Sequence, residues 1–509
     1  MAGRTQPCGA SAALAAVLAL SACAVGPDFK RPESPPGAGF TPAVLPAGTD
    51  SAPIHGGEAQ VFAIGRDIQF DWWTLFRSPA LNALVEQAFN ANPTIGAAQA
   101  ALQQAQENVY AQQGYFFPAL NAGYTVQRQQ LAGNLSSNAP GLQGNGSFIG
   151  TDSPAKPVTY NFHTAQLTVG YAPDVFGGNR RQVESLRAQA DNQRFMLEAA
   201  YITLASNVVA AALQEASTRE QIAAAREVIR VNEESLRILR DQFRFGYAMR
   251  IDVAAQEAAL AQAKALLPPL EKQYEQTRDL IRALAGNLPN QDVAATFELA
   301  ALHLPQEPPV SLPSKLIEQR PDIRAAEAQM HAASAEVGVA ISAMLPQITI
   351  TAALGGAAAS FSQMFAPGGP FWSMAGGVTQ PLFDGFTLLH RKRAADEALI
   401  QAEAQYRSTV IAAFQNVADT LHALVSDASA LAAAVDAEQA AKVTLTLTLR
   451  QSQDGYVPYL ALLSAQQAYE QALSARVQAQ AIRYGDTAAL YQALGGGWWH
   501  RSGQQTASR

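Results

Sequence analysis

The sequence predicts a mainly helical, internally duplicated protein that also contributes strands to a membrane β-barrel. Three observations predict this fold class. The stretch 320–346 repeats the design of 92–118, two long stretches lack both proline and glycine, and four short segments alternate apolar with polar residues. Helical hairpins and membrane strands account for these patterns together.

The duplication is clearest at four prolines. Pro93 and Pro118 are 25 residues apart, as are Pro321 and Pro346, and the two pairs are related by a gapless offset of 321 − 93 = 228. The first proline of each pair opens an alanine-rich helix. The second closes that helix just before a run of alternating residues, so each copy passes there from helix to strand.

The composition excludes several classes of protein. The chain has 509 residues, 48% hydrophobic and 15% charged, with a net charge of −7. An acidic balance without a basic surface argues against nucleic acid as a partner. Both cysteines lie in the first 23 residues, the histidines are scattered, and no catalytic motif is present. We therefore expect no enzyme activity, no metal site and no cofactor other than a covalent lipid.

The N-terminus is typical of a lipoprotein leader. Arg4 precedes an apolar run, Ala10 to Leu20, which is too short to span a bilayer. Leu20-Ser21-Ala22-Cys23 then looks like a lipobox. We expect residues 1–22 to be removed and Cys23 to carry the lipid; the alternative is a chance match in an alanine-rich leader. Because Ala24, not aspartate, follows, the resemblance implies the outer membrane.

An extended segment, 23–75, follows the lipobox. Residues 26–53 are rich in Pro, Gly and Ala and have no periodicity, so we expect them to lie along another part of the protein. The Trp72-Trp73 pair then opens a short amphipathic piece, and we interpret the pair as packing residues.

Four strands are predicted, at about 119–129, 159–172, 347–356 and 371–380. Each has roughly the ten residues that a tilted strand needs to cross a bilayer. Four strands cannot close a barrel, and an open edge in hydrocarbon leaves backbone groups unpaired, so copies of the chain must pool their strands. The alternative is a soluble four-stranded sheet with one buried face.

The long stretches 179–245 and 386–450 predict helices on the order of 100 Å long. Their apolar residues recur at spacings of four and three, which indicates coiled-coil packing. The first series is interrupted by Glu215, Thr218 and Asn232. Its apolar members are Leu197, Tyr201, Leu204, Val208, Ala211, Ile222, Ala225, Ile229, Leu236, Leu239 and Phe243, and the second series runs from Val410 to Leu449.

Each long helix ends at a Gly-Tyr turn, Gly246-Tyr247 or Gly455-Tyr456, and a return helix follows, at about 251–285 and 459–494. Pro268-Pro269 is predicted to kink the first return helix, which changes direction there. The expected domains are a first repeat, 76–290, a linker, 291–312, a second repeat, 313–496, and a C-terminal tail, 497–509.

The order of these elements behind a lipobox resembles the TolC family, the outer membrane factors of tripartite efflux systems. The stretches 23–32 (CAVGPDFKRP), 320–323 (RPDI) and 381–385 (PLFDG) resemble its NodT-type lipoprotein branch. The resemblance implies a homotrimer whose twelve-stranded β-barrel sits in outer membrane lipid and continues as a periplasmic α-helical barrel. It also implies two partners, a periplasmic adaptor and an inner membrane pump of the resistance-nodulation-division type.

The family's entrance lies at the tips of the hairpins, and the resemblance suggests gate residues there. Asp252 matches an aspartate that ties the first hairpin to the second, so Asp252→Ala is expected to raise channel conductance. Ser452 and Val457 replace the partner tyrosine and arginine of some members, and Ala461 and Ser464 replace their acidic ring. Arg250, Asp454 and Tyr456 could supply a different latch or be solvated turn residues.

The predicted function is a passive exit duct for small molecules such as drugs and toxic compounds, with most of the chain in the periplasm. Two alternatives remain open, an exit duct for type I protein secretion and a periplasmic coiled-coil adaptor lipoprotein. An adaptor is expected to have one hairpin and a separate β-rich part, and long helices argue against a porin.

Overall fold

The computed structural model describes residues 24–33, 39–43, 45–131 and 157–501. They form two compact units. The unit that we call the sheet unit comprises 24–30, 104–190 and 329–403 of the described residues, and the hairpin unit comprises the rest. Cys23, the predicted lipidation site, lies outside the described residues.

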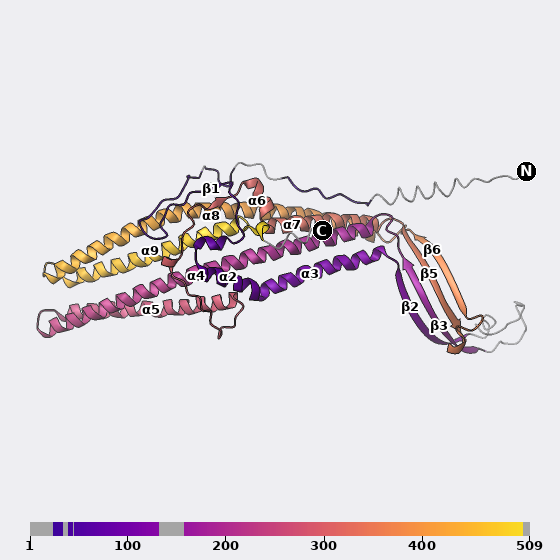
Figure 1. Cartoon of the computed structure of the whole chain (residues 1–509), viewed down its shortest axis with the longest axis horizontal. Helices are drawn as coiled ribbons and strands as arrows, with labels where there is room; N and C mark the ends of the chain where they lie inside the picture. The colour runs from indigo at the N-terminus through magenta and orange to yellow at the C-terminus, as the bar shows by residue number, and fades with distance from the viewer. Residues whose placement is uncertain (1–23, 34–38, 44, 132–156, 502–509) are drawn as a thin grey trace, which may run out of the picture. The chain divides into compact units, whose positions relative to one another are not determined.

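The sheet unit contains one antiparallel sheet of four strands in the order β2-β3-β5-β6 (Figure 1). The strands lie within two residues of the predicted bounds and are β2 (Ala119–Leu131), β3 (Val158–Tyr171), β5 (Gln347–Ala358) and β6 (Pro370–Thr379). Apolar side chains on it are exposed, among them Leu120, Tyr124 and Trp372. A sheet that leaves such side chains uncovered is suited to a lipid surface.

Proline and glycine set the ends of the helices beside this sheet. Helices α3 (Pro93–Gln113) and α7 (Pro321–Ser342) both begin with the predicted proline, and β2 and β5 begin directly after Pro118 and Pro346. Gly177, at φ +77°, forms the turn between β3 and α4. Val25 donates its N–H to the Phe176 carbonyl there, 3.1 Å away, which holds the N-terminal segment at this turn.

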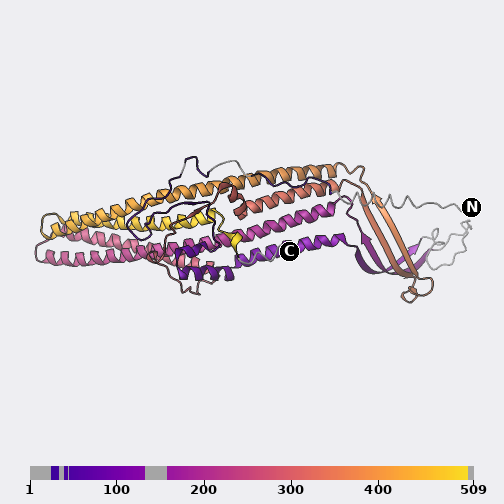
Figure 2. The ribbon, with the colours of Figure 1, turned by 45° about the horizontal axis from the view of Figure 1, so that its top comes forward.

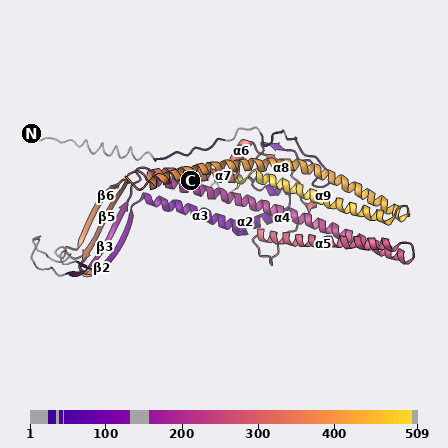
Figure 3. The same cartoon turned by 180° about the vertical axis from the view of Figure 1, so that it is seen from behind.

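Two helical hairpins dominate the hairpin unit (Figures 1 and 3). Helix α4 (Gly178–Arg244) is followed by α5 (Arg250–Leu284), and α8 (Thr387–Gln453) by α9 (Tyr459–Ala493). Helix α5 continues through Pro268 and Pro269, and the predicted change of its direction there stays a prediction. Both prolines are exposed, and the carbonyl groups that they leave without an N–H partner can be hydrated.

The spacing of four and three predicts most of the buried seam. Leu197, Val208 and Leu239 are buried in α4, and Val417 and Leu424 in α8. Phe243 and Leu449, at the distal ends of the same series, are exposed. The seam therefore fades near the tips, where a single chain offers fewer neighbours. One apolar stretch of α4 is long enough to cross a membrane, but most of it is buried in the fold.

The polar interruptions of the α4 seam are buried and paired. Glu215 lies 3.6 Å from the guanidinium of Arg278 on α5, and the Thr218 hydroxyl donates to the carbonyl of Gln214. Asn232 accepts hydrogen bonds from Gln256 of α5. Each interruption therefore has a polar or charged neighbour that offsets part of the cost of its burial.

The core of the hairpin unit gathers segments that are distant in sequence (Figure 2). Trp72 is buried and stacks on Tyr491, so the tryptophan pair is a packing element. Arg320 pairs with Asp322 at 2.6 Å and donates to the Ala493 carbonyl at the end of α9. The remaining elements are α2 (Pro79–Ala91), α6 (Pro313–Gln319) and the parallel pair β1 (Ala63–Ile64) and β4 (Pro309–Val310).

Candidate functional site

Both hairpin tips close with the same glycine turn. Gly246 and Gly455 have φ near +80°, which glycine adopts without the steric penalty that a side chain brings. Tyr247 donates its N–H to the Gln242 carbonyl, and Tyr456 donates to the Gln451 carbonyl, each at 2.8 Å. These bonds satisfy helix-end carbonyls in the Schellman pattern, so the sequence specifies both turns locally.

The predicted gate residues of the first hairpin interact within that hairpin. The Asp252 carboxylate accepts the N–H of Met249 at 3.1 Å and so caps the first turn of α5. Arg250 lies 3.5 Å from Glu257 on the same helix. The tie from Asp252 to the second hairpin stays a prediction.

The predicted gate residues of the second hairpin differ in exposure. Asp454 and Tyr456 are exposed, whereas Ser452, Val457 and Ala461 are half-buried. The exposed Ser464 hydroxyl donates to the Leu460 carbonyl of its own helix at 3.0 Å. Within the described part of the chain, none of these side chains makes a hydrogen bond or ion pair to the first hairpin.

A different set of side chains connects the two hairpins. The Tyr459 hydroxyl on α9 donates to Gln256 Oε1 on α5 at 2.7 Å. Gln256 Nε2 donates in turn to Asn232 of α4, at 2.9 Å to Oδ1 and 3.1 Å to the carbonyl. We call this chain of contacts the Asn232–Gln256–Tyr459 bridge. It joins three helices and both hairpins near their tips.

The two amide residues of the bridge are shielded from water, and Tyr459 is half-buried. Gln256 is 0% exposed and Asn232 3% exposed. Leu236, Leu239 and Val253 form an apolar cluster against which Tyr459 packs. Burial raises the pKa of Tyr459 to about 12, so the phenol stays protonated and can donate at any physiological pH. Removing one partner of such a hydrogen bond is costly, because the other partner is left buried without a donor or acceptor.

A polar cavity of about 740 Å³ lies beside the bridge, between α5 and α9. Its walls carry amide side chains, among them Gln262 and Gln471, and the carboxyl group of Glu470. Burial raises the pKa of Glu470, while a hydrogen bond with Asn232 lowers it. The cavity and the bridge therefore both lie where α9 faces α4 and α5.

Sequence reasoning missed Gln256 and Tyr459 and identified Asn232 only as an interruption. One signal was available. An asparagine at an apolar position of a long seam needs a buried partner, and a partner could be sought among polar residues at buried positions of the facing return helix. Tyr459 follows Pro458 and is the first residue of α9.

The capping role of Asp252 leads to a prediction. Asp252→Ala removes the acceptor of the Met249 N–H and is expected to destabilise the start of α5 by about 1 kcal/mol, whereas Asp252→Asn retains an acceptor. If capping is its only role, both variants keep the parent conductance in planar bilayers and only the alanine variant melts earlier. Raised conductance in both variants would instead support the predicted tie to the second hairpin.

Comparison with known proteins identifies the family. The sequence model described as outer membrane efflux protein matches residues 84–287 and 312–496. The pyoverdine export outer membrane protein OpmQ of Pseudomonas aeruginosa is 30% identical over 470 residues, covering 90% of this chain and 94% of that protein. The toluene efflux pump outer membrane protein TtgC of Pseudomonas putida is 28% identical over 492 residues, 95% of each.

Solved structures agree with the sequence comparisons. The outer-membrane channel OprN superposes with a TM-score of 0.80 at 25% identity, covering 94% of this chain and 100% of that one. The CmeC channel of Campylobacter jejuni has a TM-score of 0.81 at 20% identity, covering 93% and 95%, and supports the fold. TolC-family channels form trimers that work with pump partners. This chain belongs to the outer membrane efflux protein family and is a non-enzymatic outer membrane channel of tripartite pumps, with a long periplasmic helical part.

Proposed function

We propose that this chain forms a homotrimeric, lipid-anchored exit duct for small molecules, drugs and toxic compounds among them. Its repeats, 76–290 and 313–496, would supply two hairpins per chain, and its partners would be a periplasmic adaptor and an inner membrane pump of the resistance-nodulation-division type. The names of the relatives support this cargo, since pyoverdine and toluene are both small molecules.

Support for the lipid anchor comes from the residues that follow Cys23. Gly177 approaches Ala24 so closely that a Cβ on Gly177 would lie 2.6 Å from the Ala24 Cα. The described N-terminus is thereby held at the end of β3, where a membrane strand gives way to a helix. An acyl chain on the preceding cysteine would start beside the bilayer.

The observation that carries the gating part of the proposal is the Asn232–Gln256–Tyr459 bridge. Its two amide residues are buried and it joins the first hairpin to the second, whereas none of the predicted candidates is buried or makes a hydrogen bond between the hairpins within the described part of the chain. Opening the entrance requires α9 to move from α5, which breaks the bond between Tyr459 and Gln256. In our proposal the bridge is the latch of the resting channel.

The mass of the detergent-extracted mature protein and its behaviour in planar bilayers test this function. We expect a particle of three chains with a low resting conductance, and a deletion strain that becomes sensitive to small toxic compounds. The deletion should leave protein secretion unchanged. A monomer that stays soluble without detergent would contradict the proposal and favour an adaptor. Loss of a secreted protein without any change in sensitivity would favour a secretion duct.

A further inference from the structure

The sheet ends in two unpaired edges. Among the described residues, strands β2 and β6 each have a neighbour on one side only, and all adjacent strands of this sheet are antiparallel. With four alternating strands, β2 and β6 run in opposite directions, so β6 of one copy can continue antiparallel onto β2 of the next. Unpaired edges do not persist in hydrocarbon. We consider a second copy of the chain as the partner of these edges, an inference that rests on the proposed trimer.

The internal repeat can be checked at the level of single strand pairs. In the first copy Ala119 pairs with Gly170. Equivalent residues of the two copies differ by 228 in the part that contains α3 and β2. They differ by 209 in the part that contains β3 and α4, as the tip glycines do (455 − 246 = 209). These offsets convert the pair into Gln347 and Thr379, because 119 + 228 = 347 and 170 + 209 = 379. That pair is the observed register of β5 and β6, so the two halves are equivalent residue by residue.

The chain already contains one joint between its halves, the pairing of β3 with β5. Tyr171 lies opposite Ile350, and His163 opposite Ala358. The same offsets relate each residue of this joint to its equivalent at the outer edges. Tyr171 corresponds to Gln380 (171 + 209) and Ile350 to Ala122 (350 − 228), while His163 corresponds to Trp372 (163 + 209) and Ala358 to Gln130 (358 − 228). We propose that β6 of one copy pairs with β2 of the next with Gln380 opposite Ala122 and Trp372 opposite Gln130, so that paired residue numbers add up to 502.

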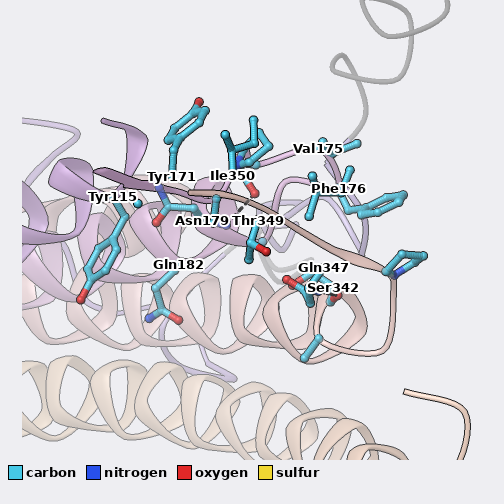
Figure 4. A pocket seen from close by; sticks show the side chains of 18 of the residues that line it. Tyr115, Tyr171, Val175, Phe176, Asn179, Gln182, Ser342, Gln347, Thr349 and Ile350 are labelled. Atoms are coloured by element: carbon cyan, nitrogen blue, oxygen red, sulfur yellow. Dashed lines mark hydrogen bonds between the residues drawn. The ribbon is translucent and has the colours of Figure 1, made fainter. Parts of the chain in front are cut away.

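The base of the β3–β5 joint shows what this contact looks like. A pocket of about 720 Å³ lies there, lined by Tyr171 and Ile350 of the two strands, Ser342 at the end of α7 and Gln347 at the start of β5. Figure 4 shows these side chains. The turn residue Gly178 meets Ser342 so closely that a Cβ on Gly178 would lie 2.4 Å from the serine Oγ. One side of this close contact therefore has to be glycine.

At the equivalent contact between two copies, the glycine and the residue with a side chain have changed places. Gly178 corresponds to Thr387 (178 + 209), and Ser342 corresponds to Gly114 (342 − 228). Between copies, the side chain therefore belongs to Thr387, which follows β6, and the glycine is Gly114, which precedes β2. A Cβ on Gly114 would have no heavy atom within 4 Å in the single chain. This open space is where the proposed register places Thr387 of the neighbouring copy.

A polar contact and an apolar surface agree with the same register. Within the chain, Gln182 donates to Glu336 Oε1 at 3.2 Å. The equivalent pair between copies is Arg391 with Asn108 (182 + 209 and 336 − 228), again a donor facing an acceptor. The ends of the unpaired edges also carry exposed apolar residues, Tyr115 and Phe117 before β2 and Leu382 and Phe383 after β6. Joining the edges would cover both groups.

Disulfide formation tests the register in the full-length protein. The parent has no cysteine after residue 23. Thr379→Cys with Gly123→Cys places the two thiols opposite each other, since 379 + 123 = 502. Thr379→Cys with Asn121→Cys or with Thr125→Cys shifts the partner by two residues, about 7 Å along the strand, which is too far for a disulfide. We expect a covalent trimer on a non-reducing gel for the first pair only.

Each result of the disulfide test has a defined meaning. Crosslinking of a shifted pair, or of none in a particle whose mass is that of a trimer, would overturn the register and leave the proposed function intact. A monomeric mass for the parent would overturn the proposed function itself.

The size exchange gives a second measurement. Gly114→Thr should weaken the trimer, seen as a lower temperature at which it dissociates in detergent, because it meets Thr387. Adding Thr387→Gly should restore the parent temperature by recreating the combination found within the chain. Equal dissociation temperatures for the parent and Gly114→Thr, or no recovery in the double variant, would contradict the contact.

Discussion

Tyr459→Phe is expected to raise the open fraction of the channel at least tenfold. The substitution keeps the ring in its apolar cluster and removes only the hydroxyl that donates to Gln256 Oε1. In the closed state the acceptor is then buried without a donor, which costs about 1 to 3 kcal/mol per copy. In the open state water supplies the donor. Since three copies would contribute, the equilibrium should shift by at least tenfold.

Single-channel recording in planar bilayers measures this shift directly. Tyr456→Phe is a matched control, because Tyr456 lies at the tip of the same hairpin but is 81% exposed. We expect the control to behave like the parent. Parent-like conductance in Tyr459→Phe would mean that the bridge does not hold the entrance closed, and would return attention to Asp252.

Arg278→Met is expected to destabilise the hairpin unit by about 3 to 5 kcal/mol. The guanidinium lies 3.6 Å from Glu215, which is 0% exposed, and also donates to the Ala295 carbonyl at 2.6 Å. Methionine leaves the carboxyl group buried without its partner on α5. Thermal unfolding in detergent, followed by the helical circular dichroism signal, would show a lower melting temperature. Arg226→Met, which removes an exposed pair with Glu271, should have little effect.

The loss of stability in Arg278→Met should depend on pH. Burial raises the pKa of Glu215 above its ordinary value of 4.5, and Arg278 and Arg219 oppose this. A carboxyl group with a raised pKa in the folded state contributes stability that is lost as pH rises from 4.5 through that pKa. Without Arg278 the pKa rises further, so the deficit should be larger at pH 8 than at pH 5. A deficit independent of pH would contradict this account.

A second substitution tests whether the buried charge is the cause. Arg278→Met combined with Glu215→Leu removes both charges and fills the space with apolar atoms, so much of the stability should return. The double variant should also lose the additional pH dependence. If it is no more stable than Arg278→Met, the contacts of Arg278 with the 293–295 backbone carry the effect instead.

The elements of this fold could be predicted because each has a local signal. Pro93 and Pro321 begin helices, Gly246 and Gly455 end them, and period-two alternation identifies the strands. Helix α5 can continue through Pro268 and Pro269 because the carbonyl groups that the prolines free can be hydrated. Both prolines of α5 face solvent, a tertiary property that the local sequence does not contain.

The bridge could not be predicted for a related reason. Gln256 and Tyr459 are separated by 459 − 256 = 203 residues, and no periodicity identifies which glutamine of an alanine-rich return helix faces a tyrosine of another hairpin. Asp252 was identified by resemblance to the family, and its carboxylate accepts a hydrogen bond from the Met249 N–H of its own hairpin. The tie from Asp252 to the second hairpin stays a prediction.

The proposed latch consists of a phenol and two amides, and this has an environmental consequence. Small ions and protons of the growth medium reach the periplasm, so a closure that depends on ion pairs would loosen in brine, where charges are screened over a few ångströms. Neutral hydrogen bonds buried among leucine and valine side chains are not screened in this way, and a phenol with a pKa of about 12 does not titrate in acid or mild alkali. The bond between Tyr459 and Gln256 is therefore expected to hold equally at low and at high ionic strength.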